Sequence, residues 1–150
     1  MFSQTLSTPC GLLVVNATDA GLYQIDFTDT PAAGQPNAHT QAAVAQLTEY
    51  FAGERQHFSL PLTATGTTFQ HQVWQALQDI AYGQTVSYGD IARRINNPKA
   101  VRAVGMANGR NPLAIVVPCH RVIGSNKTLT GYAGGLERKA FLLNHEGAVW

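Results

Sequence analysis

The chain has 150 residues, which is enough for one ordinary domain or for two small lobes that share a core. Its hydrophobic content of 45% and formal net charge of +1 fit a globular protein, and no apolar run approaches the ~20 residues that a membrane span needs. The N-terminus also lacks a basic region followed by a hydrophobic one, so we expect a cytoplasmic protein with no membrane association.

The charges are distributed unevenly along the sequence. Residues 1–86 contain one basic residue, Arg55, and six acidic residues, for a net charge of −5. Residues 87–150 contain nine basic and three acidic residues, for a net charge of +6. A basic segment is typical of proteins that bind a polyanion such as nucleic acid, although a solvated surface with segregated charges gives the same count.

The first part of the chain has the pattern of a small α/β lobe. Residues 1–28 indicate strands, because residues 12–15 are apolar, residues 19–21 form a turn signal, and Tyr23, Ile25 and Phe27 alternate with polar residues. Residues 29–38 are a loop, and residues 39–52 predict a helix that ends at Gly53. Residues 54–66 are extended and turn-rich. We therefore predict an N-terminal α/β lobe at residues 1–62 and a second domain at residues 63–150.

The second domain begins with predicted helices. Apolar residues keep a helical period over residues 67–80, and Ser87 is the expected N-cap of the next helix. A break at Asn97 and Pro98 precedes a third helix over residues 99–107, so two short helices form a helix-turn-helix pattern. Small residues dominate the third helix. Within it, beyond its first residue, Arg102 is the one long charged side chain. We expect it to contact nucleic acid; packing of its alanines against a neighbouring helix is the alternative.

The segment that follows carries the candidate chemistry. Residues 113–117 are an apolar run, which we predict to be a short buried strand, and Pro118 ends it directly before Cys119. A thiol needs a base or a positive neighbour to become a nucleophile, and His120 is adjacent. The alternative is that Cys119 is a small buried apolar residue and His120 a chance neighbour. A last helix is predicted over residues 136–145, with Leu136, Ala140 and Leu143 facing inward.

Other residues complete a possible catalytic group. Glu146 follows the last helix and could orient His120, while Asn111 lies on the turn that leads to Cys119. Cys10 is the only other cysteine and is far from Cys119 in the sequence, so the two do not form a metal-ligand spacing. We expect no metal site, no cofactor and an unoxidised thiol at Cys119.

Several ordered motifs resemble those of the O6-alkylguanine-DNA alkyltransferases, a family of direct-reversal DNA repair proteins. The resemblance covers about residues 67–147 and is highly specific, because the motifs keep consistent separations. The motifs are Phe69-Gln70, Val73-Trp74, Tyr82-Gly83, Ser87-Tyr88, Asn97-Pro98, Arg102-Ala103-Val104-Gly105, Ala107-Asn108-Gly109, Asn111-Pro112, Val117-Pro118-Cys119-His120-Arg121-Val122-Ile123, Gly131-Tyr132, Gly134-Gly135-Leu136 and Asn144-His145-Glu146-Gly147.

The resemblance implies an α+β fold in which a small N-terminal ribonuclease-H-like lobe precedes a mostly helical lobe. That second lobe would carry a helix-turn-helix, or winged-helix-like, DNA-binding motif. One branch of the family has tryptophan in place of the cysteine and only binds lesions, and Cys119 argues against that branch. Some members bind zinc through N-terminal cysteines and histidines; in this chain that lobe has one cysteine, Cys10, with His39 and His57 far along the chain, so we expect no such site.

The resemblance also implies catalytic roles. Cys119 would accept an alkyl group from guanine O6 in a single, self-inactivating turnover, and His120 would take its proton through water. Glu146 would hold His120, Asn111 would brace the turn, and Tyr88 would help to rotate the target nucleotide and donate a hydrogen bond to the departing guanine. Whether thymine O4 is a second substrate is left open by the sequence.

DNA contacts follow from the same resemblance. Arg102 would fill the gap left by the extruded nucleotide, and the small-residue helix would enter the minor groove. The partner would be double-stranded DNA that contains O6-alkylguanine, bound by a monomer. The implied DNA-binding residues are Tyr88, Arg102, Asn97, Ser125 and Gln70. The implied pocket residues are Pro118, Val122, Tyr132, Ala133 and Gly134.

Two other functions fit parts of the sequence. A papain-like thiol hydrolase would also use a cysteine and a histidine, but it would need a distant histidine and an oxyanion hole that the sequence does not distinguish. A non-enzymatic DNA-binding module would need only the helix-turn-helix and the basic segment. Loss of a thiol after incubation with alkylated DNA separates the alkyltransferase from both.

Overall fold

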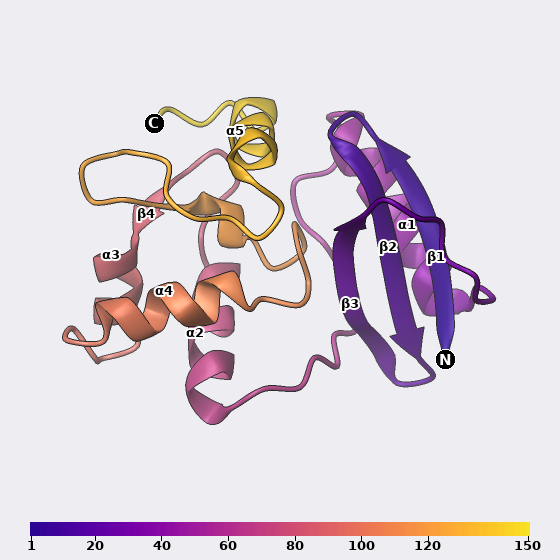
Figure 1. Cartoon of the computed structure of the whole chain (residues 1–150), viewed down its shortest axis with the longest axis horizontal. Helices are drawn as coiled ribbons and strands as arrows, with labels where there is room; N and C mark the ends of the chain where they lie inside the picture. The colour runs from indigo at the N-terminus through magenta and orange to yellow at the C-terminus, as the bar shows by residue number, and fades with distance from the viewer. The chain divides into compact units, whose positions relative to one another are not determined.

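A computed structural model describes all residues from Met1 to Trp150 (Figure 1). The chain divides into two compact units, Met1–Thr65 and Gly66–Trp150, which we call unit 1 and unit 2. The boundary lies within the segment that the sequence analysis describes as extended and turn-rich. None of the helices combines the length and the apolar character that crossing a membrane requires.

Unit 1 is an antiparallel sheet with one helix. Strands β1 (Phe2–Thr8), β2 (Gly11–Thr18) and β3 (Gly21–Thr28) pair in the order β1-β2-β3, and α1 (Ala38–Phe51) packs on them. Alternate residues of β2 are fully buried, as expected for a sheet with one face covered by a helix. Asn37 caps α1 by accepting a hydrogen bond from the Thr40 amide.

A β-bulge lies at the start of the segment for which the sequence predicts alternation, residues 23–27. Leu22 pairs with Ala17 and Gln24 pairs with Asn16, so Tyr23 is an extra residue in a β-bulge. As a result Leu22 and Ile25 are both buried, and Tyr23 is only partly covered. Beyond the bulge the predicted alternation holds, since Ile25 is buried and Asp26 is exposed.

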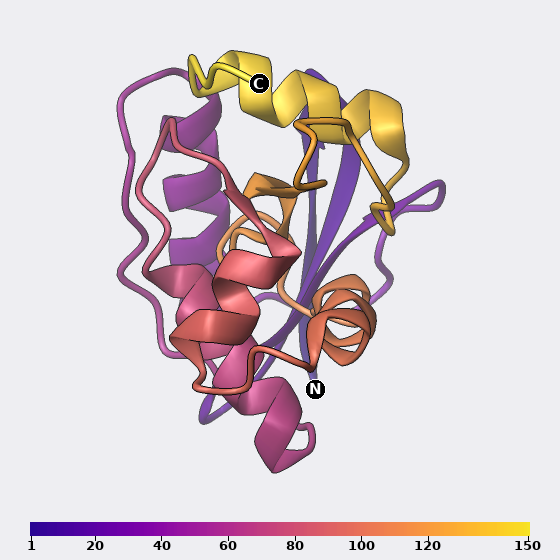
Figure 2. The same cartoon turned by 90° about the vertical axis from the view of Figure 1, so that its left-hand side faces the viewer.

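Unit 2 is mainly helical (Figure 2). Its elements are α2 (Thr68–Gln78), β4 (Val86–Ser87), α3 (Tyr88–Arg94), α4 (Val101–Gly109), the 3₁₀ helix η1 (Cys119–Arg121), β5 (Val122–Ile123) and α5 (Leu136–His145). Helix α2 packs against both α3 and α4, and α3 packs against α4. The expected helix-turn-helix and the expected N-cap at Ser87 are both confirmed, since the Ser87 side chain accepts a hydrogen bond from the Asp90 amide.

The segment before Cys119 differs from its prediction. Residues 114–116 form turns, and a backbone hydrogen bond from Val117 to Leu113 of 3.0 Å closes them. Ile115 has a φ of 72° and is 1% exposed. Four of the five residues of the apolar run are buried, as predicted, and Val116 is partly exposed. The prediction of a strand was wrong, because a short apolar run does not distinguish a strand from a buried turn. The strand β5 comes after Cys119 and pairs in parallel with β4.

Helix α5 has the predicted bounds but a different inward face. Leu142 and Leu143 are fully buried as part of the core, and Lys139 beside them is also fully buried. Leu136, which the sequence analysis places inside, is 47% exposed. The helical period gave the right length, but hydrophobicity alone could not indicate that a lysine replaces a leucine on the buried face.

Candidate active site

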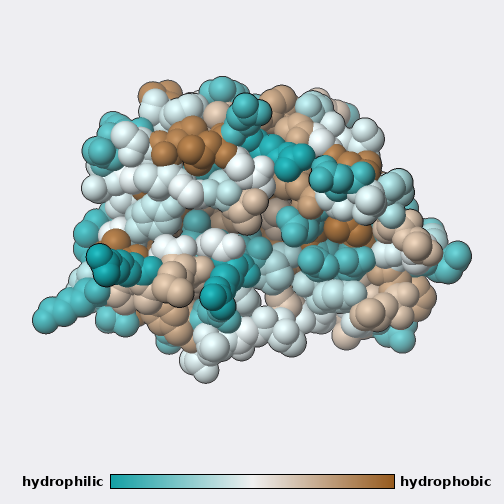
Figure 3. Space-filling view, in the orientation of Figure 1, coloured by the Kyte–Doolittle hydropathy of each residue, from teal (hydrophilic) through white to brown (hydrophobic).

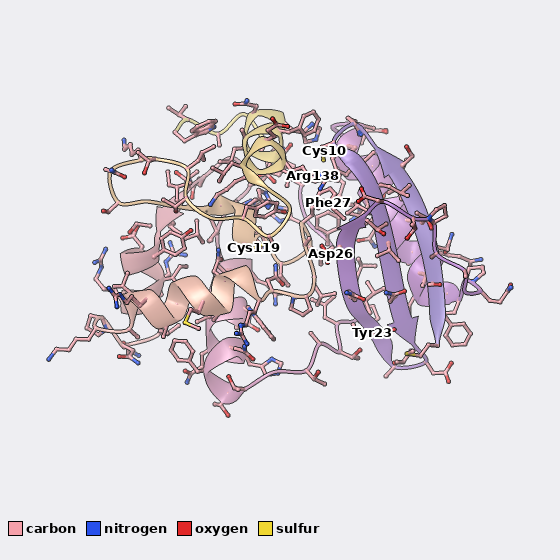
Figure 4. All side chains as sticks on the ribbon, viewed as in Figure 1. Cys10, Tyr23, Asp26, Phe27, Cys119 and Arg138 are labelled. Carbon is pink, nitrogen blue, oxygen red and sulfur yellow. The ribbon has the colours of Figure 1, made fainter.

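Cys119 opens the tight turn η1, between α4 and α5 (Figure 4). Its amide donates to the Val117 carbonyl at 2.8 Å, and the Arg121 amide donates to the Pro118 carbonyl at 3.1 Å. Consecutive side chains in a 3₁₀ helix diverge by about 120°, so Cys119, His120 and Arg121 point in different directions from one turn. Cys119 is present as a thiol and is 6% exposed.

Two asparagines hold the backbone around Cys119. Asn111 donates to the Val117 carbonyl at 2.7 Å and accepts from the Leu113 amide at 3.0 Å, so it spans the turn before the cysteine. Asn108 of α4 donates to the carbonyl of Cys119 itself at 3.4 Å and is buried. Asn111 was predicted as a site residue, whereas Asn108 belongs to one of the family motifs but was given no role.

His120 and Glu146 lie together in the core of unit 2. His120 Nε2 is 2.8 Å from Glu146 Oε2, and both side chains are 0% exposed. Because a carboxylate only accepts, Nε2 carries the proton of this hydrogen bond. The other ring nitrogen, Nδ1, is buried without a hydrogen-bond partner. A neutral ring with its proton on Nε2 leaves Nδ1 as a base that can accept a proton.

Arg121 is the residue of this group that sequence reasoning missed. Its Nε donates to Glu146 Oε1 at 2.8 Å and its Nη2 donates to Glu146 Oε2 at 3.0 Å. Its Nη1 donates to the Ile80 carbonyl at 2.7 Å, so the buried guanidinium joins η1 to the end of α2 and to the residue after α5. An arginine next to a candidate nucleophile resembles a DNA-contacting residue in sequence, but here it is internal.

The electrostatics of the group follow from burial and pairing. Burial alone would raise the pKa of Glu146, but hydrogen bonds from His120 and Arg121 outweigh it and hold that pKa well below its usual range. Burial lowers the pKa of His120, and the hydrogen bond to Glu146 only partly opposes this effect. The carboxylate is therefore charged and the imidazole neutral near neutral pH, which is the state in which His120 can act as a base.

A second buried cation approaches the group from α5. Lys139 Nζ donates to the Thr130 carbonyl at 2.7 Å and is within 3.4 Å of the Gly131 carbonyl. Burial lowers the pKa of Lys139 to about 8, and an attraction to Cys119 partly offsets this effect. Lys139 is thus charged near pH 7 and close enough to Cys119 to interact with it. A positive neighbour of this kind favours a thiolate.

A pocket of about 450 Å³ lies in unit 2, and its lining includes Thr130 and Gly131, whose carbonyls Lys139 contacts, but not Cys119 itself. Its lining comes from α3, α4 and the loop between β5 and α5, and includes Asn108, whose amide reaches Cys119. The volume lies in the range of small-molecule sites. The lining residues are Tyr88, Val101, Gly105, Asn108, Gly109, Gly124, Thr130, Gly131, Tyr132 and Ala133.

The predicted pocket residues agree with this lining only in part. Tyr132 and Ala133 line the pocket, as does Tyr88, whereas Pro118, Val122 and Gly134 do not. Pro118 and Val122 are buried, because they belong to the tight turn and the strand that carry the cysteine. The other residues that line the pocket come from α4 and from the loop before α5.

The predicted DNA-binding residues lie in different surroundings. Arg102, Asn97 and Ser125 are exposed, on α4, the turn before it and the loop after β5. Gln70 uses its side chain to complete the cap of α2, since its Oε1 accepts from the Thr67 amide at 2.9 Å. Strongly hydrophilic side chains project from unit 2 where α3 leads into α4, the segment that contains exposed Arg93, Arg94 and Lys99 (Figure 3).

Comparisons with known proteins agree with these features. Residues 1–64 match the ribonuclease-like domain of the 6-O-methylguanine DNA methyltransferases, and residues 68–148 match the DNA binding domain of the same family. Among curated relatives, the constitutive methylated-DNA–protein-cysteine methyltransferase of Bacillus subtilis is 53% identical, over 95% of this chain and 93% of the relative. A methylated-DNA–protein-cysteine methyltransferase of Methanosarcina acetivorans is 46% identical over 99% of both chains.

Solved structures give the same result for the fold. The O6-methylguanine methyltransferase of Mycobacterium tuberculosis matches with a TM-score of 0.88 and 44% identity, over 97% of this chain and 92% of that one. A structure of Mycobacterium tuberculosis OGT in complex with DNA matches with a TM-score of 0.90 and 45% identity, over 98% and 93% of the two chains. The expected ribonuclease-like lobe and helix-turn-helix lobe are thereby confirmed, and the chain belongs to the 6-O-methylguanine DNA methyltransferase family.

Proposed function

We propose that this chain repairs DNA by direct reversal, transferring an alkyl group from guanine O6 to Cys119. The observation that carries the proposal is the buried group of Cys119, His120, Glu146 and Arg121 in a helix-turn-helix unit, linked through Asn108 to a pocket. Relatives at 46–53% identity are named methylated-DNA–protein-cysteine methyltransferases, which supports the same reaction here.

The chemistry assigns one role to each group. His120 Nδ1 accepts the thiol proton through water, and Glu146 and Arg121 hold the ring in the tautomer that allows this. The sulfur then forms a bond to the alkyl carbon while the bond from that carbon to O6 breaks. The electron pair stays on guanine, which takes up a proton, and the Tyr88 hydroxyl donates a hydrogen bond to the departing base.

Reaching the alkyl group requires DNA binding and base extrusion. The alkylated O6 lies inside the base stack, so the nucleotide must leave the duplex at a cost of a few kcal/mol. Helix α4 would lie in the minor groove, where its alanines and glycines permit close approach and exposed Arg102 fills the gap. The basic residues around it would contact phosphates, which carry no sequence information and suit a lesion found in any context. One monomer would act on each lesion.

The single-turnover character is the first test. A thioether on Cys119 has no good leaving group, and regeneration would need a further nucleophile. With duplex DNA containing O6-methylguanine in excess, repair should stop at one methyl group per chain. Peptide mass analysis should place the adduct on the peptide that contains Cys119. Continued product formation with unmodified Cys119 would show a true catalyst, such as a thiol hydrolase, and an intact lesion after tight binding would show a binding module.

A second test concerns Arg102. Replacing Arg102 with alanine should slow repair of duplex O6-methylguanine about tenfold or more, because extrusion is no longer assisted. Reaction with free O6-benzylguanine, which needs no extrusion, should change less than about twofold. Single-turnover rates on the two substrates measure the effect.

The control for Arg102 is Arg55→Ala, which removes one positive charge from unit 1. This variant should behave as wild type on both substrates. Binding of wild-type protein to the duplex should weaken as the salt concentration rises, because the phosphate contacts of the surrounding basic residues release counterions. Equal losses on duplex and free base would instead assign Arg102 to folding.

A further inference from the structure

The Tyr88 hydroxyl is already engaged at the edge of the pocket. Thr130 Oγ1 donates to the Tyr88 oxygen at 3.0 Å, and both residues line the pocket. The reverse contact, from the Tyr88 hydroxyl to the Thr130 carbonyl, is 3.5 Å long and at the limit of a hydrogen bond. The phenol oxygen therefore accepts a good hydrogen bond, while the phenol proton has only a weak one.

Lys139 makes the Thr130 carbonyl a poor competitor for that proton. Its ammonium donates to this carbonyl at 2.7 Å, a short charge-assisted hydrogen bond. Lys139 is fully buried on α5 beside Leu142 and Leu143, so its position is fixed by the core. The loop residue Thr130 is thus held on one side by a rigid helix and contacts Tyr88 with its hydroxyl on the other.

This contact is unlike an ordinary loop hydrogen bond. Thr128, two residues earlier, bonds within its own turn, since its hydroxyl donates to Asn126 Oδ1 at 2.6 Å. Thr130 instead reaches a residue 42 positions away, on the first turn of α3. The loop before α5 has no helix or strand that would set this geometry. The Thr130–Tyr88 bond therefore fixes the loop and the phenol relative to each other across the pocket.

We propose that Thr130 is a positioning residue for the alkyl transfer, acting through Tyr88. Its hydroxyl donates to the Tyr88 oxygen, which turns the phenol proton toward the pocket and strengthens it as a donor to the leaving guanine. Lys139 holds Thr130 in the place where it can do this. The inference rests on the proposed function, because the donor role of Tyr88 belongs to it.

Two substitutions at one exposed position test the inference. Thr130→Val keeps the shape and removes the hydroxyl, whereas Thr130→Ser keeps the hydroxyl and removes the methyl group. Thr130→Val should lower the single-turnover rate at saturating duplex about fivefold, the effect of one neutral hydrogen bond. Thr130→Ser should stay within about twofold of wild type. Duplex affinity and the melting temperature should not change in either variant, since Thr130 is exposed.

A double-mutant cycle separates positioning from a general loop effect. In a Tyr88→Phe background no phenol oxygen remains, so adding Thr130→Val should cause no further loss of rate. The same loss in both backgrounds, or a loss in Thr130→Ser as large as in Thr130→Val, would overturn the inference.

Failure of the inference can be told from failure of the proposed function. A wild-type rate in Thr130→Val, with wild-type protein still alkylated on Cys119, would refute the role of Thr130 alone. Wild-type protein that leaves O6-methylguanine DNA and Cys119 unchanged would refute the proposed function, and the role of Thr130 with it.

Discussion

Replacing Cys119 with serine should abolish alkyl transfer, reducing the plateau from one methyl group per chain to none. A serine hydroxyl stays protonated near neutral pH and is a much poorer nucleophile for saturated carbon than a thiolate. The proposed base His120 and the nearby cation Lys139 could not compensate for this difference. The measurement is the transfer of labelled methyl groups from duplex O6-methylguanine to protein.

Binding supplies the control for this variant. Cys119 is 6% exposed in the turn η1, whereas Arg102 and Asn97 are exposed on or before α4. Cys119→Ser should therefore bind lesion-containing duplex with an affinity within about twofold of wild type. Cys10→Ser, which removes the thiol of unit 1, should keep the full plateau. Transfer by Cys119→Ser at the wild-type rate would refute the assignment of the nucleophile.

The Arg121→Met substitution should destabilise the protein by about 3–5 kcal/mol. Glu146 would keep its charge in a site that is 0% exposed, with one of its two partners gone, and an uncompensated buried charge is costly. The Ile80 carbonyl would also lose its partner. Tryptophan fluorescence during urea unfolding measures the change, because Trp74 and Trp150 both belong to unit 2.

Two further variants serve as controls for Arg121→Met. Arg93 pairs with Asp90 on the surface, so Arg93→Met should cost less than about 1 kcal/mol. Adding Glu146→Gln to Arg121→Met removes the stranded charge and should recover part of the lost stability. If Arg121→Met were no more harmful than Arg93→Met, the buried pair would not stabilise unit 2.

In unit 2, the sequence predicted the helices and their caps better than the backbone conformation of the buried segment before Cys119. The helical period of the apolar residues predicted α5, and the short polar side chain of Ser87 predicted the N-cap of α3. Both are local signals. The strand predicted at residues 113–117 was wrong, because hydrophobicity there indicates burial and carries no information about backbone dihedrals.

In the candidate site, too, some residues were predicted from the sequence and others were missed. The sequence predicts Cys119, His120, Glu146 and Asn111 as site residues, and the structure brings them around one turn. Arg121 and Lys139 were missed, since basic side chains are normally outside and only the burial of their partners indicates otherwise. Thr130 was missed because its partner is distant in the sequence.

The backbone conformation at Ile115 also restricts which amino acids can replace this residue during evolution. A β-branched residue at a φ of 72° costs roughly 1–2 kcal/mol, which glycine or asparagine would avoid. The same side chain is 1% exposed, and burying it contributes roughly 1.5–3 kcal/mol, which glycine or asparagine would lose. No natural amino acid meets both demands, so each substitution exchanges one loss for another. Descendants of this chain should therefore vary among large aliphatic residues at position 115, and improvement there would have to come from the neighbouring positions.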